Sequence, residues 1–189
     1  MGTLGYAILG LLAREALSGC DVGRRMGGRV GFFWEARHGQ IYPELARLEG
    51  RGFVVHEAVE QRGRPDKKVY RITGAGLEAL RGWATEPPRA RATKDELVLK
   101  AYSVWLADRK GAISLFRDEG RLHEGRLRRY EEISAWMEEE WGEDLGRPDS
   151  PRFASYAALR RGILNERGYA EWCGWVADRL EGDAGGADG

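Results

Sequence analysis

The stretch GQIYPELARLEGRGF, residues 39–53, decides the fold of this chain and raises the question of what its helix does. Ile41, Leu45 and Leu48 recur at the i, i+4, i+7 spacing that places apolar side chains on one side of a helix. Two glycines follow directly and predict the end of that helix. An amide, a phenol and a proline lie in the first turns of the same helix, around Ile41, and the surrounding sequence has to indicate their purpose.

The residues after this helix predict a β-hairpin and another helix. FVVHEAVE (53–60) and KKVYRIT (67–73) are rich in the Val, Ile and Tyr residues that favour strands. The link QRGRPD (61–66) contains Gly and Pro, as the tip of a longer hairpin does. Thr73 is then placed to cap a helix over residues 74–84.

Two helices are predicted before the opening stretch. The first has an apolar stripe formed by Leu4, Ala7, Ile8, Leu11 and Leu12. Leu9 lies off that stripe, which predicts burial on more than one side. Ser18 can cap a second helix over residues 20–30, in which Val22 and Met26 share one face. Three helices, a hairpin and a further helix form the order of a winged helix-turn-helix domain.

The second half of the chain is predicted to be helical. Residues 86–92 form a linker, because consecutive prolines stop a helix, and they separate domains at 1–85 and 93–181. Apolar residues have helical spacing over residues 94–108, 112–142 and 153–180. Residues 182–189 lack apolar side chains and are expected to be a disordered tail. The fold class is therefore mainly α with a small β-hairpin: a winged helix-turn-helix followed by an all-helical dimerisation domain.

Composition and motifs exclude several classes of protein. Residues 1–92 carry 15 Lys and Arg against 10 Asp and Glu, and the remainder carries 15 against 20, so the first half suits a polyanionic partner. Cys20 and Cys173 give no disulfide framework, which favours buried free thiols in a cytoplasmic protein. No apolar run is long enough to span a membrane. No catalytic, nucleotide-binding or metal-ligand motif points to an enzyme, a cofactor or a metal site.

The N-terminus of the opening helix is predicted to read DNA. The recognition-helix set is His38, Gln40, Tyr42, Pro43 and Arg47. A helix enters the major groove with its first residues at the base edges, where Gln40 can pair with adenine and Tyr42 can reach a phosphate or a thymine methyl. Pro43 suits a first turn, whose N–H groups lack partners. Arg47 and Glu44 lie further along the same polar side. His38 is as well placed for a helix cap as for a phosphate contact, and a merely solvated helix face is the alternative for the whole set.

The hairpin carries the cations expected of a wing. The wing set is Arg62, Arg64, Lys67, Lys68 and Arg71. Such a tip is suited to lie along phosphates or to place an arginine in the minor groove. A basic turn is often only solvated surface, but its place directly after a recognition helix favours the DNA interpretation. A winged helix that binds an acidic protein without sequence-specific DNA binding is the alternative, and the salt dependence of binding to duplex DNA separates the two.

Three blocks of sequence resemble the PadR family of transcriptional regulators. They are ILGLLAREALSG, HGQIYPELARLEGRGFV and GRPDKKVYRITGAGLEAL, in that order within residues 4–82. Tyr42 matches the tyrosine at the mouth of the family's recognition helix. Arg64, Lys67 and Lys68 match the family's wing positions. The resemblance implies a homodimeric repressor that binds a palindromic operator in double-stranded DNA.

The helical second half is predicted to form the dimer. Its apolar stripe can pair with the same stripe of a second copy or with that copy's N-terminal helix, an exchange that the family resemblance supports. The predicted interface residues are Leu4, Ile8, Leu11, Leu122, Tyr130, Ile133 and Met137. A twofold dimer would place the two recognition helices about 34–36 Å apart, one turn of DNA.

Aromatic residues in the second half predict a site for a small effector. The resemblance implies this as well, since some PadR regulators sense phenolic acids or drugs in aromatic-lined cavities. The predicted lining is Tyr102, Trp105, Phe116 and Trp172. Trp105 is expected to share an inward helix face with Leu97, and a role of these aromatics in the dimer core is an equally open alternative. We expect a planar aromatic effector to release the operator by a population shift.

Overall fold

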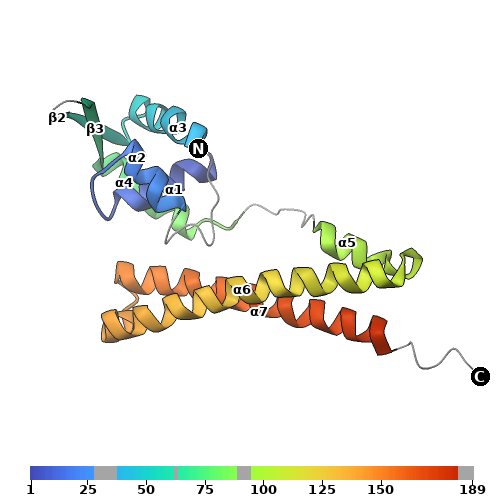
Figure 1. Cartoon of the computed structure of the whole chain (residues 1–189). Coiled ribbons are helices and arrows are strands. Elements are labelled where there is room, and N and C mark those ends of the chain that lie inside the picture. The colour runs from blue at the N-terminus through green and yellow to red at the C-terminus, as the bar shows by residue number, and fades with distance from the viewer. Residues whose placement is uncertain (28–37, 62–63, 89–94, 183–189) are drawn as a thin grey trace, which may run out of the picture. The chain divides into compact units, whose positions relative to one another are not determined.

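The computed structural model of the chain describes residues 1–27, 38–61, 64–88 and 95–182. The chain divides into two compact units, Met1–Arg89 and Ala90–Gly189 (Figure 1). The boundary between them lies inside the predicted linker. Both units are mainly helical, and a small sheet belongs to the first, so the predicted fold class is confirmed. Apart from Gly182, the predicted tail lies outside the described residues.

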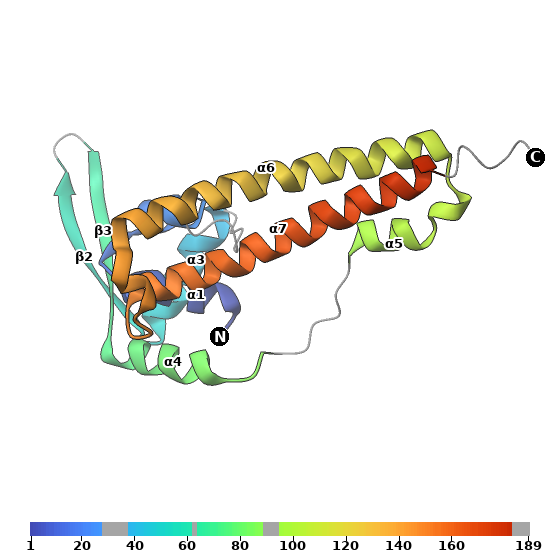
Figure 2. The same cartoon turned by 90° about the horizontal axis from the view of Figure 1, so that it is seen from below.

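The N-terminal unit has the element order of a winged helix-turn-helix. Its elements are α1 (Thr3–Leu12), β1 (Leu17–Ser18), α2 (Gly19–Gly27), α3 (His38–Gly50), β2 (Val54–Gln61), β3 (Arg64–Ile72) and α4 (Gly74–Thr85). Figure 2 shows β2 and β3 as an arm that extends away from the helices of this unit. The antiparallel sheet has the order β1–β3–β2, so it has three strands where the sequence predicted two. A strand of two residues is too short to leave an alternating pattern.

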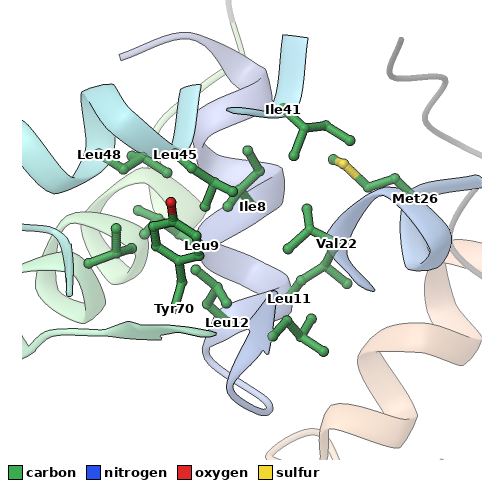
Figure 3. Packing of buried hydrophobic residues seen from close by; sticks show 12 residues of the cluster. Ile8, Leu9, Leu11, Leu12, Val22, Met26, Ile41, Leu45, Leu48 and Tyr70 are labelled. Carbon is green, nitrogen blue, oxygen red and sulfur yellow. The ribbon is translucent and has the colours of Figure 1, made fainter. Parts of the chain in front are cut away.

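Helix α1 lies at the centre of the core of this unit. Figure 3 shows its side chains flanked by those of α2, α3 and β3. The buried cluster consists of Ile8, Leu9, Leu11, Leu12, Leu17, Val22, Met26, Ile41, Leu45, Leu48, Val54 and Tyr70. Leu9 is fully buried, as predicted. The assignment of Ile8 and Leu11 to a dimer interface is wrong, because the core of their own unit buries both side chains; Leu4 is partly buried against the same cluster.

Local hydrogen bonds fix the ends of the elements around α3. The Ser18 hydroxyl oxygen accepts a hydrogen bond from the Asp21 N–H at 3.2 Å, which confirms the predicted cap of α2. The Thr73 hydroxyl caps α4 by accepting from the Gly76 N–H at 3.1 Å and donates to the Gly52 carbonyl at 2.7 Å. Gly52 has a φ of 71°, in the left-handed region that favours glycine, and turns the chain from α3 into β2.

The C-terminal unit is built on two long helices. Its elements are α5 (Glu96–Tyr102), the 3-10 helix η1 (Val104–Leu106), α6 (Arg109–Trp141), the 3-10 helix η2 (Gly142–Gly146) and α7 (Pro151–Gly182). Figures 1 and 2 show α6 and α7 side by side. Phe116 and Cys173 are buried between them, and Leu97 of α5 packs against this cluster. The chain leaves α-helical geometry at Ser103, so Trp105 is 78% exposed, and its predicted place beside Leu97 is wrong.

Polar contacts also join α6 to α7 at several levels. They are Arg117 with Asp178 (2.6 Å) and Glu181 (2.7 Å), His123 with Glu166 (2.6 Å), and Arg167 with Glu131 (2.8 Å). His123 and Glu166 are buried, and the His123 ring stacks on Tyr169. The two helices are therefore held together along their length and not only at the apolar cluster around Phe116.

The two cysteines lie in different environments. Cys20 is exposed at the start of α2, so its predicted burial is wrong. Cys173 is buried, and its burial raises the pKa of its thiol. Among the described residues, no group of three His, Cys, Asp or Glu side chains is arranged to hold a metal ion. No described helix combines the length and the apolarity that crossing a membrane requires.

Gly76 is predicted to tolerate no side chain. A Cβ at this position would lie 2.1 Å from the carbonyl oxygen of Phe53, because α4 begins directly against the start of β2. We expect Gly76→Ala to lower the free energy of unfolding by roughly 1–3 kcal/mol, measured by urea denaturation. Gly82→Ala in the same helix is the matched control, since its Cβ would meet open space, and it should be neutral or raise stability by up to about 1 kcal/mol. Equal effects of the two substitutions would contradict the close approach.

Candidate nucleic-acid interface

The inward face of α3 decides which of its residues point outward. Ile41, Leu45 and Leu48 are buried in the core around α1 (Figure 3). The other sides of the helix expose four of the predicted recognition residues: Gln40, Tyr42, Pro43 and Arg47. The structure therefore places these four on the surface.

Helix α3 begins earlier than the sequence indicated. It starts at His38, so Pro43 lies in its second turn and not in its first, where it was predicted. A proline at this position cannot donate to the carbonyl of Gly39, four residues earlier. Gly39 is exposed, so water can take the place of the missing N–H. The side chain of His38 lies outside what the structure describes, and its role stays a prediction.

Glu44 faces the protein and not the outer side of α3, so the prediction that it lies there is wrong. Its side chain is only 9% exposed and reaches α1, where a Cβ on Gly5 would lie 2.7 Å from its Oε1. Arg47 Nη1 donates to Glu44 Oε2 at 3.1 Å. The Arg47 side chain is nevertheless 73% exposed, so it compensates a buried carboxylate and still meets solvent.

Tyr42 lies over the first turn of α2. A Cβ on Gly19 would be 2.5 Å from Cε1 of the Tyr42 ring, so only a glycine leaves room for the ring in this position. Tyr42 remains 58% exposed. The ring is thus supported on one side by α2 and open on the other, which suits a group that contacts a ligand at the surface.

The two lysines of the wing have different environments. The Nζ atom of Lys67 is 2.8 Å from Asp21 Oδ2, and both side chains are partly buried. Lys68 is exposed and forms no ion pair with any residue that the structure describes. Successive side chains of a strand point to opposite faces, so the two ammonium groups leave opposite faces of the hairpin. The two adjacent lysines of the predicted wing set therefore differ in their contacts and cannot be treated as one unit.

Of the three remaining wing cations, the structure describes the side chain of Arg71 alone. Arg71 lies 3.8 Å from Glu57, with both side chains more than half exposed, which makes a weak pair. Arg62 lies outside the described residues. The side chain of Arg64, at the start of β3, is likewise outside what the structure describes. The predicted roles of Arg62 and Arg64 stay predictions.

Asp21 is the residue at this surface that sequence reasoning missed. Its carboxylate accepts from Lys67, from the Ser18 hydroxyl at 2.7 Å and from Arg24 at 3.1 Å. The hydrogen bond from Lys67 and then that from Ser18 lower the pKa of Asp21 from its usual 3.8 to about 2. The available signal was the spacing of Ser18 and Asp21, a hydroxyl followed three residues later by a carboxylate, as in a capping box.

The four predicted effector residues do not come together. Phe116 and Trp172 pack edge to face with ring centroids 5.7 Å apart, whereas Tyr102 and Trp105 are exposed. Phe116 lines a hollow of about 380 Å³, which we call the Phe116 hollow. Its other lining residues include Lys100, Val104, Asp108, Ala112 and Leu115. Trp172 instead lines a separate and more open groove with Val98 and Tyr169.

The predicted interface residues of α6 differ in exposure. Leu122 is exposed, Tyr130 and Ile133 are partly buried, and Met137 is buried. The assignment of Met137 to an interface is therefore wrong, because its side chain offers no surface. A further set of exposed apolar residues was not predicted as an interface. It lies on α5 and η1, is called the α5 surface, and consists of Val98, Leu99, Tyr102, Trp105 and Leu106.

The depressed pKa of Asp21 predicts a pH dependence of stability. The folded state favours the ionised carboxylate, so its contribution is present above about pH 4 and is lost as the pH falls towards about 2. We expect the difference in unfolding free energy between the wild type and Asp21→Asn to shrink over that range. The exposed Glu86→Gln serves as the control. A carboxyl resonance of Asp21 that titrates near pH 4 in the folded protein would contradict the shift.

Comparison with known proteins finds a family match in each half of the chain. Residues 8–82 match the family described as the transcriptional regulator PadR-like family, and residues 93–181 match the family described as virulence activator alpha C-term. The negative transcriptional regulator PadR of Bacillus subtilis (strain 168) is 33% identical over 191 residues, which cover 97% of this chain and 100% of the relative.

Two crystal structures of Bacillus subtilis PadR are similar over most of the chain. The structure in complex with operator DNA has a TM-score of 0.80 and 32% identity, and it covers 95% of this chain and 99% of that one. The structure in complex with p-coumaric acid has a TM-score of 0.75 at the same identity and coverage. Because a relative of 33% identity covers nearly the whole chain and the first half matches the family model, the chain belongs to the PadR-like family of transcriptional regulators, whose members are regulators and not enzymes.

Proposed function

We propose that the protein is a homodimeric, sequence-specific repressor that binds a palindromic operator in double-stranded DNA and leaves it when a small planar aromatic effector binds. The observation that carries this proposal is the outer surface of the N-terminal unit, where the exposed start of α3 and the cationic β2–β3 arm belong to one compact body. A negative transcriptional regulator with 33% identity, whose structure is known with operator DNA, supports it.

Four exposed side chains on this surface have roles in the proposal. Gln40 presents an amide that can bond both N6 and N7 of adenine in the major groove. Tyr42, supported by Gly19, offers a phenol for a phosphate or a ring edge for a thymine methyl. Arg47 and Lys68 face solvent and supply charge to the phosphates, which position the protein without reading sequence.

The α5 surface supports the homodimer. Its five large apolar side chains are each at least half exposed within one short segment. Soluble monomers rarely expose large contiguous apolar patches, which commonly mark protein interfaces. In a twofold dimer the patch of one copy packs against the same patch of the other, so both patches are covered. We place the dimer contact at this surface, together with the exposed Leu122 of the predicted set.

The Phe116 hollow supports the small aromatic effector. Its volume of about 380 Å³ lies within the range of small-molecule sites, and most of its named lining side chains are apolar. Lys100 also lines it. Its ammonium pairs with Glu96 at 2.8 Å, but both side chains are more than half exposed, so an acidic group on a ligand can compete for it. The relative whose structure contains p-coumaric acid, a planar aromatic acid, agrees with this class of effector.

Sequencing the genomic DNA fragments that the purified protein retains tests the function directly. We expect enrichment of an inverted repeat with half-sites about 10–10.5 base pairs apart, or a multiple of that distance. Planar aromatic acids added to the isolated complex should release the DNA. Absence of enrichment together with a shallow salt dependence would reject the repressor and favour the protein-binding alternative.

Substitutions on the outer surface should separate sequence reading from charge. We expect Tyr42→Ala to weaken operator binding about tenfold without lowering thermal stability, since the ring supports no core. Lys68→Met should weaken binding to all duplexes and reduce the slope of log affinity against log salt by about one unit. Fluorescence anisotropy over a salt series measures both, with the exposed Lys110→Met as the matched control. A slope that Lys68→Met leaves unchanged would mean that Lys68 contacts no phosphate.

Charges placed on the α5 surface should separate the two copies. We expect the double variant Leu99→Asp with Leu106→Asp to be monomeric at micromolar concentration and to lose operator affinity, because carboxylates resist desolvation in an apolar interface. Light scattering after size exclusion measures the mass. Ala157→Asp adds a carboxylate at an exposed position of α7 and should stay dimeric. A monomeric wild type would refute the homodimer, and a dimeric double variant would move the interface elsewhere.

A further inference from the structure

The first turn of α2 contacts both elements that the proposed function assigns to DNA. The ring of Tyr42 in α3 occupies the space where a side chain on Gly19 would begin. The carboxylate of Asp21 lies 2.8 Å from the ammonium of Lys67 in the wing. One short segment, residues 18–21, therefore supports the recognition helix and the wing together.

The ion pair holds the wing at a point that the small sheet does not reach. β1 pairs with β3 only through Leu17 with Tyr70 and Ser18 with Val69. Lys67 lies two residues beyond Val69 towards the tip, and its side chain leaves the same face of the strand. Beyond Val69, the backbone of β3 is paired with β2 alone among the described strands. The contact of Lys67 with Asp21 therefore extends the attachment of the wing to the body of the unit.

Asp21 has the fixed geometry that an anchor needs. Its Oδ2 accepts from the Ser18 hydroxyl at 2.7 Å as well as from Lys67, and its Oδ1 lies 3.1 Å from Arg24. Both carboxylate oxygens are thus engaged, and the residue belongs to the first turn of a helix. Arg24 is largely exposed, whereas Lys67 and Asp21 are both partly buried, so the pair with Lys67 is the better shielded of the two.

We propose that the Asp21–Lys67 pair sets the position of the wing for DNA binding, so that Asp21 is a positioning residue and the charge of Lys67 is used inside the protein. This inference rests on the proposed function. It separates the two adjacent lysines of the wing: Lys68 provides charge to the phosphates, and Lys67 aligns the strand from which Lys68 projects.

The two possible roles of Lys67 predict opposite effects of removing the Asp21 charge. If Lys67 positions the wing, loss of its partner loosens the wing and weakens operator binding. If Lys67 binds a phosphate, Asp21 competes with the DNA, and its loss strengthens binding. The salt dependence differs as well, because only a cation that neutralises a phosphate contributes to counterion release.

The test measures operator binding over a salt series for Asp21→Asn, Lys67→Met, Lys67→Arg and the double variant of the first two. We expect each of the first two to weaken binding roughly twofold to fivefold, as the loss of one partly exposed ion pair implies. The double variant should be no weaker than either single variant, since both remove the same contact. Lys67→Arg should bind like the wild type. None should change the salt slope, whereas Lys68→Met lowers it by about one unit.

Three outcomes would overturn the inference: tighter binding by Asp21→Asn, a salt slope reduced by Lys67→Met, or unchanged affinity in both. Asp21→Asn also frees Arg24, but Lys67→Met does not, so equal losses assign the effect to the pair. Circular dichroism establishes that the variants are folded. Hydrogen exchange of the β3 amides gives a readout without DNA, and it should become faster in Asp21→Asn and Lys67→Met but not in Lys67→Arg. A wild type that ignores duplex DNA would reject the proposed function and leave this second readout to decide the role of the pair.

Discussion

Burial of Ile41, Leu45 and Leu48 in the core around α1 fixes the rotation of α3 about its own axis. Each residue of an α-helix is turned by about 100° from the previous one, so a shift of the buried stripe by one position would carry Gln40 and Tyr42 to another side. Apolar packing therefore determines where the polar groups point, although those groups take no part in the core. Buried residues that contact no ligand therefore determine the positions of the polar side chains on the surface of the N-terminal unit.

The cations of the N-terminal unit are more committed to internal contacts than their number suggests. Lys67 is bound to Asp21, Arg47 compensates the buried Glu44, and Arg71 has a weak partner on the neighbouring strand. Each such contact reduces the positive charge that is available to neutralise phosphates. The net charge of a half-chain thus overestimates the electrostatic attraction for DNA, and the pattern of pairing is the better guide.

Elements with a long apolar repeat could be predicted from the sequence, and contacts between distant residues could not. Helix α3 was found through its stripe, and the caps at Ser18 and Thr73 through residue type and position. β1 was not predicted because its existence depends on pairing with β3, about fifty residues later in the chain, and not on its own two residues. Glu44 was placed outside because a carboxylate between apolar positions resembles a surface residue, and only the close approach of α1 explains its burial.

The exposure of several candidate residues could be predicted from the sequence, but their contacts within the protein could not. Tyr42 and Lys68 are exposed as expected, whereas the partner of Lys67 depends on how α2 meets β3. In the second half, periodicity predicted α6 and α7 but not the end of α5 at Tyr102, which leaves Trp105 in solvent. Which aromatic residues share a cavity depends on how the α5–η1 segment, α6 and α7 pack together. That packing cannot be predicted from the apolar periodicity of a single sequence.

The length of α6 has a mechanical consequence. Its 33 residues, at about 1.5 Å of rise each, make a rod of roughly 50 Å that is fastened to α7 by Arg117, His123 and Arg167. A stiff rod of that length that tilts by about 5° around one end carries its other end through roughly 4 Å. The Phe116 hollow lies near the first turns of this rod. A slight angular adjustment there would be magnified at Trp141 into a travel greater than the reach of a hydrogen bond, about 3 Å.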